Sequence, residues 1–172
     1  NAILGDPALE AEIEQKIKDI FGSIPAGEVA VKDEPALPDN AEPIVGIITD
    51  AEAQNSRIDI LWKHAPIPVE YQNTDAAYLN DLLISIISNI MDERFNDIAA
   101  KPDAPFFAAG LFTRDLCNAC EAYNAAVLFK DGASVEAFTA LMTEIEKMKR
   151  YGFNEGEVQR AKDNIINHYE KA

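Results

Sequence analysis

Histidine and cysteine are the residue types best suited to metal binding and nucleophilic catalysis, and this chain has few of either. Its two histidines, His64 and His168, lie far apart in the sequence. A catalytic zinc usually takes three protein ligands, often histidines. Neither histidine belongs to an H-E-x-x-H or H-x-x-E-H motif, in which two imidazoles share one helical face. We therefore expect two ordinary histidines, either packed or in contact with solvent, and no metal site in this chain.

The two cysteines, Cys117 and Cys120, form a single C-x-x-C pair. A structural zinc site normally needs four ligands, and a thioredoxin-type pair needs its first cysteine at a helix N-terminus. This pair lies between two segments with strand patterns, and positions i and i+3 of a strand point to opposite faces. We expect two packing cysteines that indicate little about the redox compartment.

Other catalytic patterns are missing from the sequence. There is no G-x-S-x-G nucleophile elbow, and the eight glycines occur singly, so no glycine-rich phosphate loop is present. Acidic residues do cluster, at Asp92, Glu93 and Asp97 and again at Glu155 and Glu157. A Mg²⁺ or Ca²⁺ site would require such carboxylates to converge. On amphipathic helices they more commonly form a solvated face, which is what we expect here.

Arg94 is the one residue that we single out as a candidate interdomain or substrate contact. It precedes Phe95 on an expected long helix and has acidic neighbours at Asp92 and Asp97. A structural role is favoured, because arginine often packs its stem on apolar surface and keeps its guanidinium in water. The alternative is that the guanidinium reaches a partner domain or a substrate.

Composition excludes several classes of function. The chain has 172 residues, of which 48% are hydrophobic, and a net charge of −15 from 30 acidic and 15 basic residues. Such an acidic chain lacks the basic face that nucleic acids and anionic membranes require. No apolar run reaches the roughly 18 residues of a membrane span. The first residues do not resemble a secretory signal. We expect Asn1 and Ala2 to be a scar of tag removal, and the chain to be a piece of a longer protein.

The first half of the chain combines one helix, a proline-rich loop and two strands. Residues 7–21 have a helical apolar stripe, with Asp6 as the N-cap. Residues 24–43 contain four prolines, at positions 25, 35, 38 and 43, and we expect a loop. The apolar run at 44–48 predicts a buried strand, and the alternation over 56–64 predicts a half-buried one. A hairpin through residues 50–55 would join them.

The second half predicts a long helix, two strands and two further helices. The helix spans 74–100, and the strands span 106–113 and 121–130. Ser134 is expected to cap the next helix and Gly152 to end it. Asn154 and Glu157 predict a capping box at the start of the last helix. Strands joined by short loops pair antiparallel, which gives an α+β two-layer sandwich with helices covering one face of a mainly antiparallel sheet. We expect one domain over residues 1–172.

Several strings, in this order, resemble the non-catalytic domain that follows the catalytic domain in insulinase-type (pitrilysin family) zinc metallopeptidases. They are ILGD at 3–6 leading into a helix that ends FGSIP, DERF at 92–95, APFF at 104–107 and GFNEGEVQRAK at 152–162. The last string is similar to the family pattern G-hydrophobic-S/T-x-x-E-hydrophobic-x-R-A-K. Phe95 stands where leucine is commoner, and Asn154 where serine or threonine is usual. These departures concern packing and capping, not chemistry.

The resemblance implies a ferredoxin-like, metallopeptidase-half fold, in a parent chain whose domains close around a chamber. In that family the zinc motif H-x-x-E-H and a distal glutamate ligand belong to the preceding domain, so no catalytic or metal-binding residue is carried over to this chain. The implied role is to form the chamber wall and present substrate. The implied partners are the preceding catalytic domain, the second half of the parent chain and substrate peptide. The cell envelope or periplasm of bacteria is the implied location.

Two alternatives remain open at the level of the sequence. Some proteins of this fold have lost the metal motif and act as assembly scaffolds, and a free-standing acidic binding module is also compatible with the composition. An H-x-x-E-H motif about one domain upstream would favour the peptidase, and a degenerate version would favour the scaffold. In either case we expect the chain alone to bind no zinc and to hydrolyse no peptide bond.

Overall fold

A computed structural model describes residues 7–25, 27–28 and 37–171, which fall into two compact units, Asn1–Asp33 and Glu34–Ala172. In the first unit, helix α1 (Pro7–Phe21) agrees with the predicted range. Its surface carries pairs spaced four residues apart, including Lys16 Nζ to Glu12 Oε1 at 2.7 Å, which support a helix locally. The expected N-cap at Asp6 and the ILGD string lie outside the described residues.

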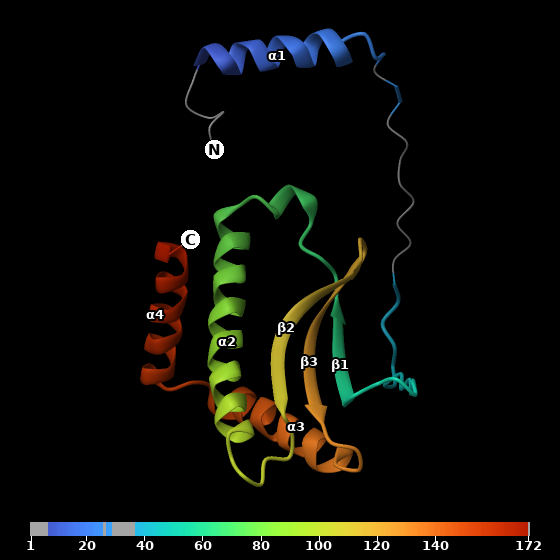
Figure 1. Cartoon of the computed structure of the whole chain (residues 1–172), viewed down its shortest axis with the longest axis vertical. Helices are drawn as coiled ribbons and strands as arrows, with labels where there is room; N and C mark the ends of the chain where they lie inside the picture. Colours follow the sequence, from blue (N-terminus) through green and yellow to red (C-terminus); the bar gives the residue numbers. More distant parts are fainter. Residues whose placement is uncertain (1–6, 26, 29–36, 172) are drawn as a thin grey trace. The chain divides into compact units, whose positions relative to one another are not determined.

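The second unit is built on a three-stranded antiparallel sheet in the order β1-β3-β2 (Figure 1). The strands are β1 (Ser56–His64), β2 (Ala108–Cys117) and β3 (Cys120–Phe129). Ala125 at the centre of β3 pairs with Ile60 of β1 and Leu111 of β2. The predicted range of β1 is confirmed, whereas β2 begins later and ends later than predicted. The prediction of a mainly antiparallel α+β fold is confirmed.

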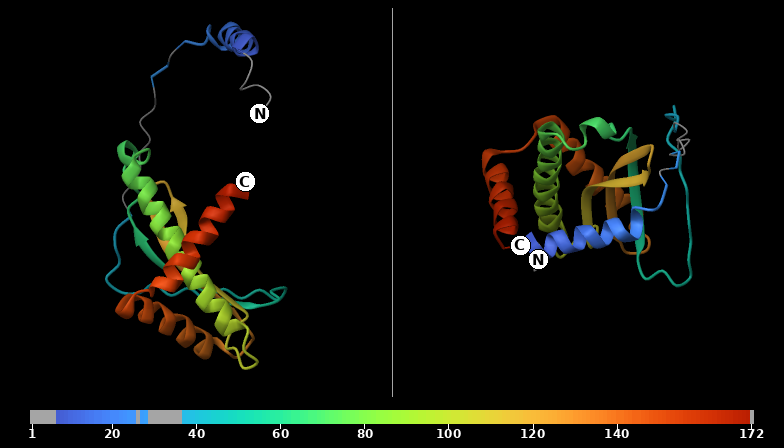
Figure 2. Two further views of the ribbon diagram at one scale, coloured as in Figure 1. Left: turned by 90° about the vertical axis from the view of Figure 1, so that its left-hand side faces the viewer. Right: turned by 90° about the horizontal axis from the view of Figure 1, so that it is seen from above.

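Two helices cover one face of this sheet. Helix α2 (Asp75–Ala99) packs on β2, and α3 (Ser134–Tyr151) packs on β3 and β1. Helix α4 (Glu155–Lys171) packs on α2 (Figures 1 and 2). A short 3-10 helix, η1 (Val69–Tyr71), connects β1 to α2. The sheet therefore forms one layer and α2 and α3 form the second, while α4 contacts mainly α2.

The core lies between the sheet and two helices, against the C-terminal half of α2 and the middle of α3. Its fully buried side chains include Met91, Phe95, Val127 and Leu141. Phe95 meets the ring of Phe106 edge to face, with centroids 6.3 Å apart and planes at 79°. Such edge-to-face pairs add to the energy of simple burial.

Helix α2 is buried only along its C-terminal half. Thr74 caps it by accepting a hydrogen bond from the Ala77 N–H at 3.3 Å. The predicted apolar stripe begins at Tyr78, yet Tyr78 and Leu83 are exposed, and apart from the small Ala77 the buried side chains of this helix begin at Ile90. The prediction of a deeply buried helix is therefore wrong for its first turns, because α3 crosses the sheet near the other end of α2 (Figure 1).

Glycines mark both ends of α3. Gly132, in the turn after β3, has φ +84°, and Gly152, at the helix C-terminus, has φ +67°. These left-handed values are accessible to glycine at little steric cost. The residue in the N-cap position is Ala133, which makes no side-chain cap bond. The prediction that Ser134 caps the helix is therefore wrong by one position.

Residues 44–48 form no strand, which corrects the prediction of a buried strand and hairpin. The segment is a drawn-out trace without helix or strand, and all five residues are exposed (Figure 1). Strand formation needs a partner for the backbone as well as apolar side chains. No backbone hydrogen bond joins residues 43–49 to another backbone group in the described part of the chain.

The two cysteines flank the turn between β2 and β3. Cys117 and Cys120 are direct cross-strand partners on either side of Asn118 and Ala119. The expectation that they point to opposite faces is wrong, since two residues across a hairpin are neighbours on the same face. Both are free thiols, Cys117 exposed and Cys120 buried, and Cys120 Sγ donates to the Glu121 carbonyl at 3.4 Å.

Candidate functional site

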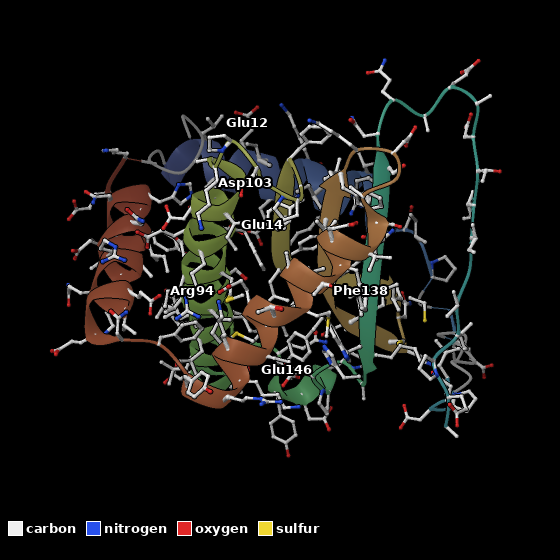
Figure 3. All side chains as sticks on the ribbon, turned by 90° about the horizontal axis from the view of Figure 1, so that it is seen from below. Glu12, Glu14, Arg94, Asp103, Phe138 and Glu146 are labelled. Carbon is white, nitrogen blue, oxygen red and sulfur yellow. The ribbon has the colours of Figure 1, made fainter. Side chains whose placement is uncertain are left out.

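Arg94 lies on α2 where that helix meets α4, and a carboxylate engages its guanidinium through two hydrogen bonds. Nε donates to Glu157 Oε1 at 2.7 Å and Nη2 donates to Glu157 Oε2 at 2.9 Å. Nη2 also donates to the Gly152 carbonyl at 3.3 Å, and the guanidinium carbon lies 5.2 Å from the centre of the Phe153 ring. The two charged side chains are 21% and 11% exposed (Figure 3 labels Arg94).

Glu157 also completes the predicted capping box at the start of α4. Its Oε2 accepts from the Asn154 N–H at 2.9 Å, and its own N–H donates to Asn154 Oδ1 at 3.0 Å. The hydrogen bond from Arg94, and then the one from the Asn154 backbone, hold the pKa of this carboxyl below its ordinary value of 4.5. One carboxylate thus joins α2 to the first turn of α4.

The ion-pair partner of Arg94 is not one of its acidic neighbours in the sequence. Asp92 and Asp97, its neighbours on α2, make no ion pair with it, and the partner comes from 63 residues further along the chain. Glu93 instead pairs with Arg160 of α4 at 2.8 Å, in a more exposed position. The expected acidic face is therefore partly a seam of ion pairs between two helices.

Arg94 also lines an open cavity of about 530 Å³ that has both charged and apolar side chains in its lining. Side chains of both signs surround it: Asp97, Glu144, Lys147 and Glu157. A mixed lining of this kind lacks convergent groups of one chemistry. The arrangement at Arg94 fits a structural role in which the ion pair with Glu157, here called the clasp, joins α2 to α4 while Arg94 also borders the cavity.

A second cavity, of about 320 Å³, opens between the sheet and the two covering helices. Its lining is almost entirely apolar, and includes Trp62, Leu111 and Tyr123 of the sheet, Ile84 and Ile87 of α2, and Met148 of α3. Ligand pockets span roughly 300–1,000 Å³ and are mostly apolar. The exposed faces of Trp62 and Tyr123 border this cavity.

A third cavity, of about 410 Å³, adjoins the second and has a mixed lining that includes acidic side chains. Tyr123 and Ile84 line both. Its charged groups are Asp81, Asp115 and Glu121, without a lysine or arginine in the lining. We call these two adjoining cavities the groove. Sequence reasoning missed it because its residues come from β1, β2, β3, α2 and α3, and only tertiary packing brings them together.

The two histidines lie on separate elements, His64 on β1 and His168 on α4. His64 lies at the end of β1, with its ring 4.5 Å from that of Tyr123, and its Nδ1 is 4.0 Å from Glu121 Oε2. His168 is exposed on α4. Among residues 7–25, 27–28 and 37–171, no group of three or more His, Cys, Asp or Glu is arranged to hold a metal ion. No helix in the same residues is long and apolar enough to cross a membrane.

A family model described as "Peptidase M16 inactive domain" matches residues 2–165. The chain belongs to this family. It is a non-catalytic domain of the insulinase-type metallopeptidases, as the string resemblance implied. The match covers α1, the sheet and almost all of the helical layer. A search of curated proteins found no match to the sequence.

The fold of this M16 domain is similar to part of a solved bacterial protease structure. The periplasmic protease PqqL from Escherichia coli matches with a TM-score of 0.76 and 19% identity, over 94% of this chain and 18% of that one. The first half of PqqL matches with a TM-score of 0.75 and 18% identity, over 94% of this chain and 34% of that one. This M16 domain therefore spans only a small part of the chains it matches.

Proposed function

We propose that this domain forms part of the wall of an enclosed proteolytic chamber and presents substrate peptide to a zinc centre on the preceding domain of the same parent chain. The observation that carries the substrate role is the groove formed by two adjoining cavities that share Ile84 and Tyr123. One cavity is apolar at Trp62 and Leu111, and the other is acidic at Asp115 and Glu121. A peptide with a bulky apolar residue beside a basic one fits such a lining by charge and by burial.

The division of labour follows from the residues. The described residues contain no group of three or more His, Cys, Asp or Glu that could hold a metal ion, which supports a division of labour in which the metal, the general base and the bond-breaking chemistry lie on another domain. The second half of the parent chain would close the chamber. The periplasm is the proposed location, in keeping with the periplasmic protease that shares the fold.

Arg94 keeps a proposed secondary role as an interdomain contact. Its Glu157 clasp fixes the guanidinium on the surface where α2, α3 and α4 meet, beside the mixed cavity. A neighbouring domain seated there would meet an arginine already held in place, with little side-chain entropy left to lose.

The test is steady-state kinetics of the full parent chain on peptides with an apolar–basic pair. We expect Trp62→Ala to raise KM several-fold with kcat nearly unchanged, because a groove remote from zinc contributes to binding rather than to the chemical step. The matched control is Val69→Ala, an exposed side chain that does not line the groove.

Thermal melting of both variants verifies that the fold is kept. An unchanged KM in a folded Trp62→Ala parent would contradict substrate presentation by this groove. A parent chain without zinc or peptidase activity would favour the assembly scaffold instead.

A further inference from the structure

The segment at residues 44–48 is the most exposed apolar run in the described chain. Ile44 and Val45 are each 81% exposed, and Ile48 is 96% exposed. A Cβ placed on Gly46 would meet no atom within 4 Å. Exposed aliphatic residues are normal singly, whereas a contiguous run marks a surface that is covered by a partner.

The pattern within the run indicates what kind of partner covers it. In an extended conformation, Ile44, Gly46 and Ile48 face one side, and Val45 and Ile47 face the other. Both sides are apolar, which is typical of strands in sheets covered on both faces. A run of five residues also has the usual length of a strand.

The edge of β1 does not suit this run, although the two are close in the sequence. The face of β1 that points away from the helices carries three charged residues, Arg57, Asp59 and Lys63, around a single apolar one, Leu61. A strand added there would set one of its apolar sides beside these charges. The connecting chain contacts β1 through a side chain, since Lys63 Nζ donates to the Pro38 carbonyl at 3.1 Å, and Asp50 Oδ1 accepts from the Glu52 N–H at 2.8 Å in a local turn. Residues 43–49 make no backbone hydrogen bond to β1.

A second copy of the chain also does not suit it. Antiparallel pairing of two such runs centred on Gly46 would bring Glu42 of each opposite Asp50 of the other. Like charges directly opposite each other are destabilising. Each copy also carries a net charge of −15, which opposes association.

We infer that residues 44–48 add as a strand to the open edge of a β-sheet in a neighbouring domain of the same parent chain, a sheet whose two faces are both covered. This inference rests on the proposed function only for the existence of that neighbour. The pairing satisfies the free backbone groups of the run and buries its aliphatic side chains. This strand pairing would link the two domains through the segment that connects α1 to β1.

Hydrogen–deuterium exchange of the full parent chain, read by mass spectrometry on peptides covering 43–50, tests this inference. We expect these amides to exchange at least about 100-fold more slowly than unstructured ones. Ile47→Lys, which puts a charge on one covered side, should return them to fast exchange. Val69→Lys, at a residue 78% exposed on η1, is the matched control and should leave them slow.

Fast exchange at 43–50 in the unmodified parent would overturn the inference, and so would protection that disappears on dilution, which would indicate a second copy. Slow exchange that extends to every amide of β1 would indicate pairing with β1 and also overturn it. If Ile47→Lys fails to fold, the exchange of the unmodified parent still decides. The readout does not depend on peptidase activity, so it can fail while the proposed function stands, and the reverse.

Discussion

Glu157 stabilises two contacts at once, because its carboxylate accepts hydrogen bonds from Arg94 of α2 and also caps the start of α4. The sequence predicts the cap, since Asn154 and Glu157 have the local spacing of a capping box. It does not predict the ion pair, because the 63-residue separation carries no local signal. Residue types near one another in sequence thus indicated the wrong partners for Arg94.

Glu157→Gln should lower the free energy of unfolding by about 2 kcal/mol, somewhat less than the cost of breaking a fully buried pair. Glutamine can still serve the capping box, so the loss reports mainly the ion pair with Arg94. Glu93→Gln is the control, since its pair with Arg160 is 42% and 55% exposed and should be worth under about 1 kcal/mol. Urea unfolding gives both values. Equal losses in the two variants would contradict this account of the clasp.

The same pair should make stability depend on acid. The pKa of Glu157 is lowered in the folded state, so its contribution is fully present above the ordinary value of 4.5 and is lost as pH falls through the lowered value. The difference in unfolding free energy between the natural chain and Glu157→Gln should therefore shrink from pH 5 to pH 3. Urea titrations across this range measure it, and a constant difference would refute the assignment.

At the scale of elements, apolar periodicity correctly predicted the ranges of several helices and strands, whereas the pairing of the run at 44–48 with β1 was predicted wrongly. The ranges of α1, α2 and β1 follow from the spacing of apolar residues within each element, and the start of α2 is also marked by its cap, Thr74. The run at 44–48 has the residues of a strand, but a strand also requires an edge, and no edge in the described chain pairs with it. The groove was beyond prediction for the same reason: Trp62 and Ile84 meet through packing, not through spacing.

The two halves of α2 should respond differently to the same kind of truncation. Met91→Ala removes a fully buried side chain of the core and should cost about 2–4 kcal/mol. Leu83→Ala, two turns earlier and 60% exposed, should change stability by less than about 0.5 kcal/mol. Thermal and urea unfolding of residues 1–172 compare them. A cost at Leu83 equal to that at Met91 would show that the first turns of α2 are covered.

At the scale of the whole molecule, this acidic domain has no metal cluster in its described residues, and two of its apolar surfaces are the groove and the run at 44–48. Both are surfaces that a single domain of this size would ordinarily bury. The net charge of −15 opposes self-association through them, so the fold is suited to being enclosed by other parts of one chain rather than by copies of itself.

The purified chain of residues 1–172 should contain no stoichiometric zinc and should cleave no peptide. The physical reason is ligand supply: zinc needs about four donors at bonding distance, and His64 and His168 lie on separate elements, half-buried and exposed respectively. Elemental analysis after dialysis against zinc, beside a fluorogenic peptide assay with and without chelator, measures both. About one tightly held zinc per chain, or chelator-sensitive cleavage that survives repurification, would mean that the chain carries chemistry of its own. The full parent chain, assayed in parallel, is the positive control, because under the proposed function it carries the zinc domain and should cleave the same peptides.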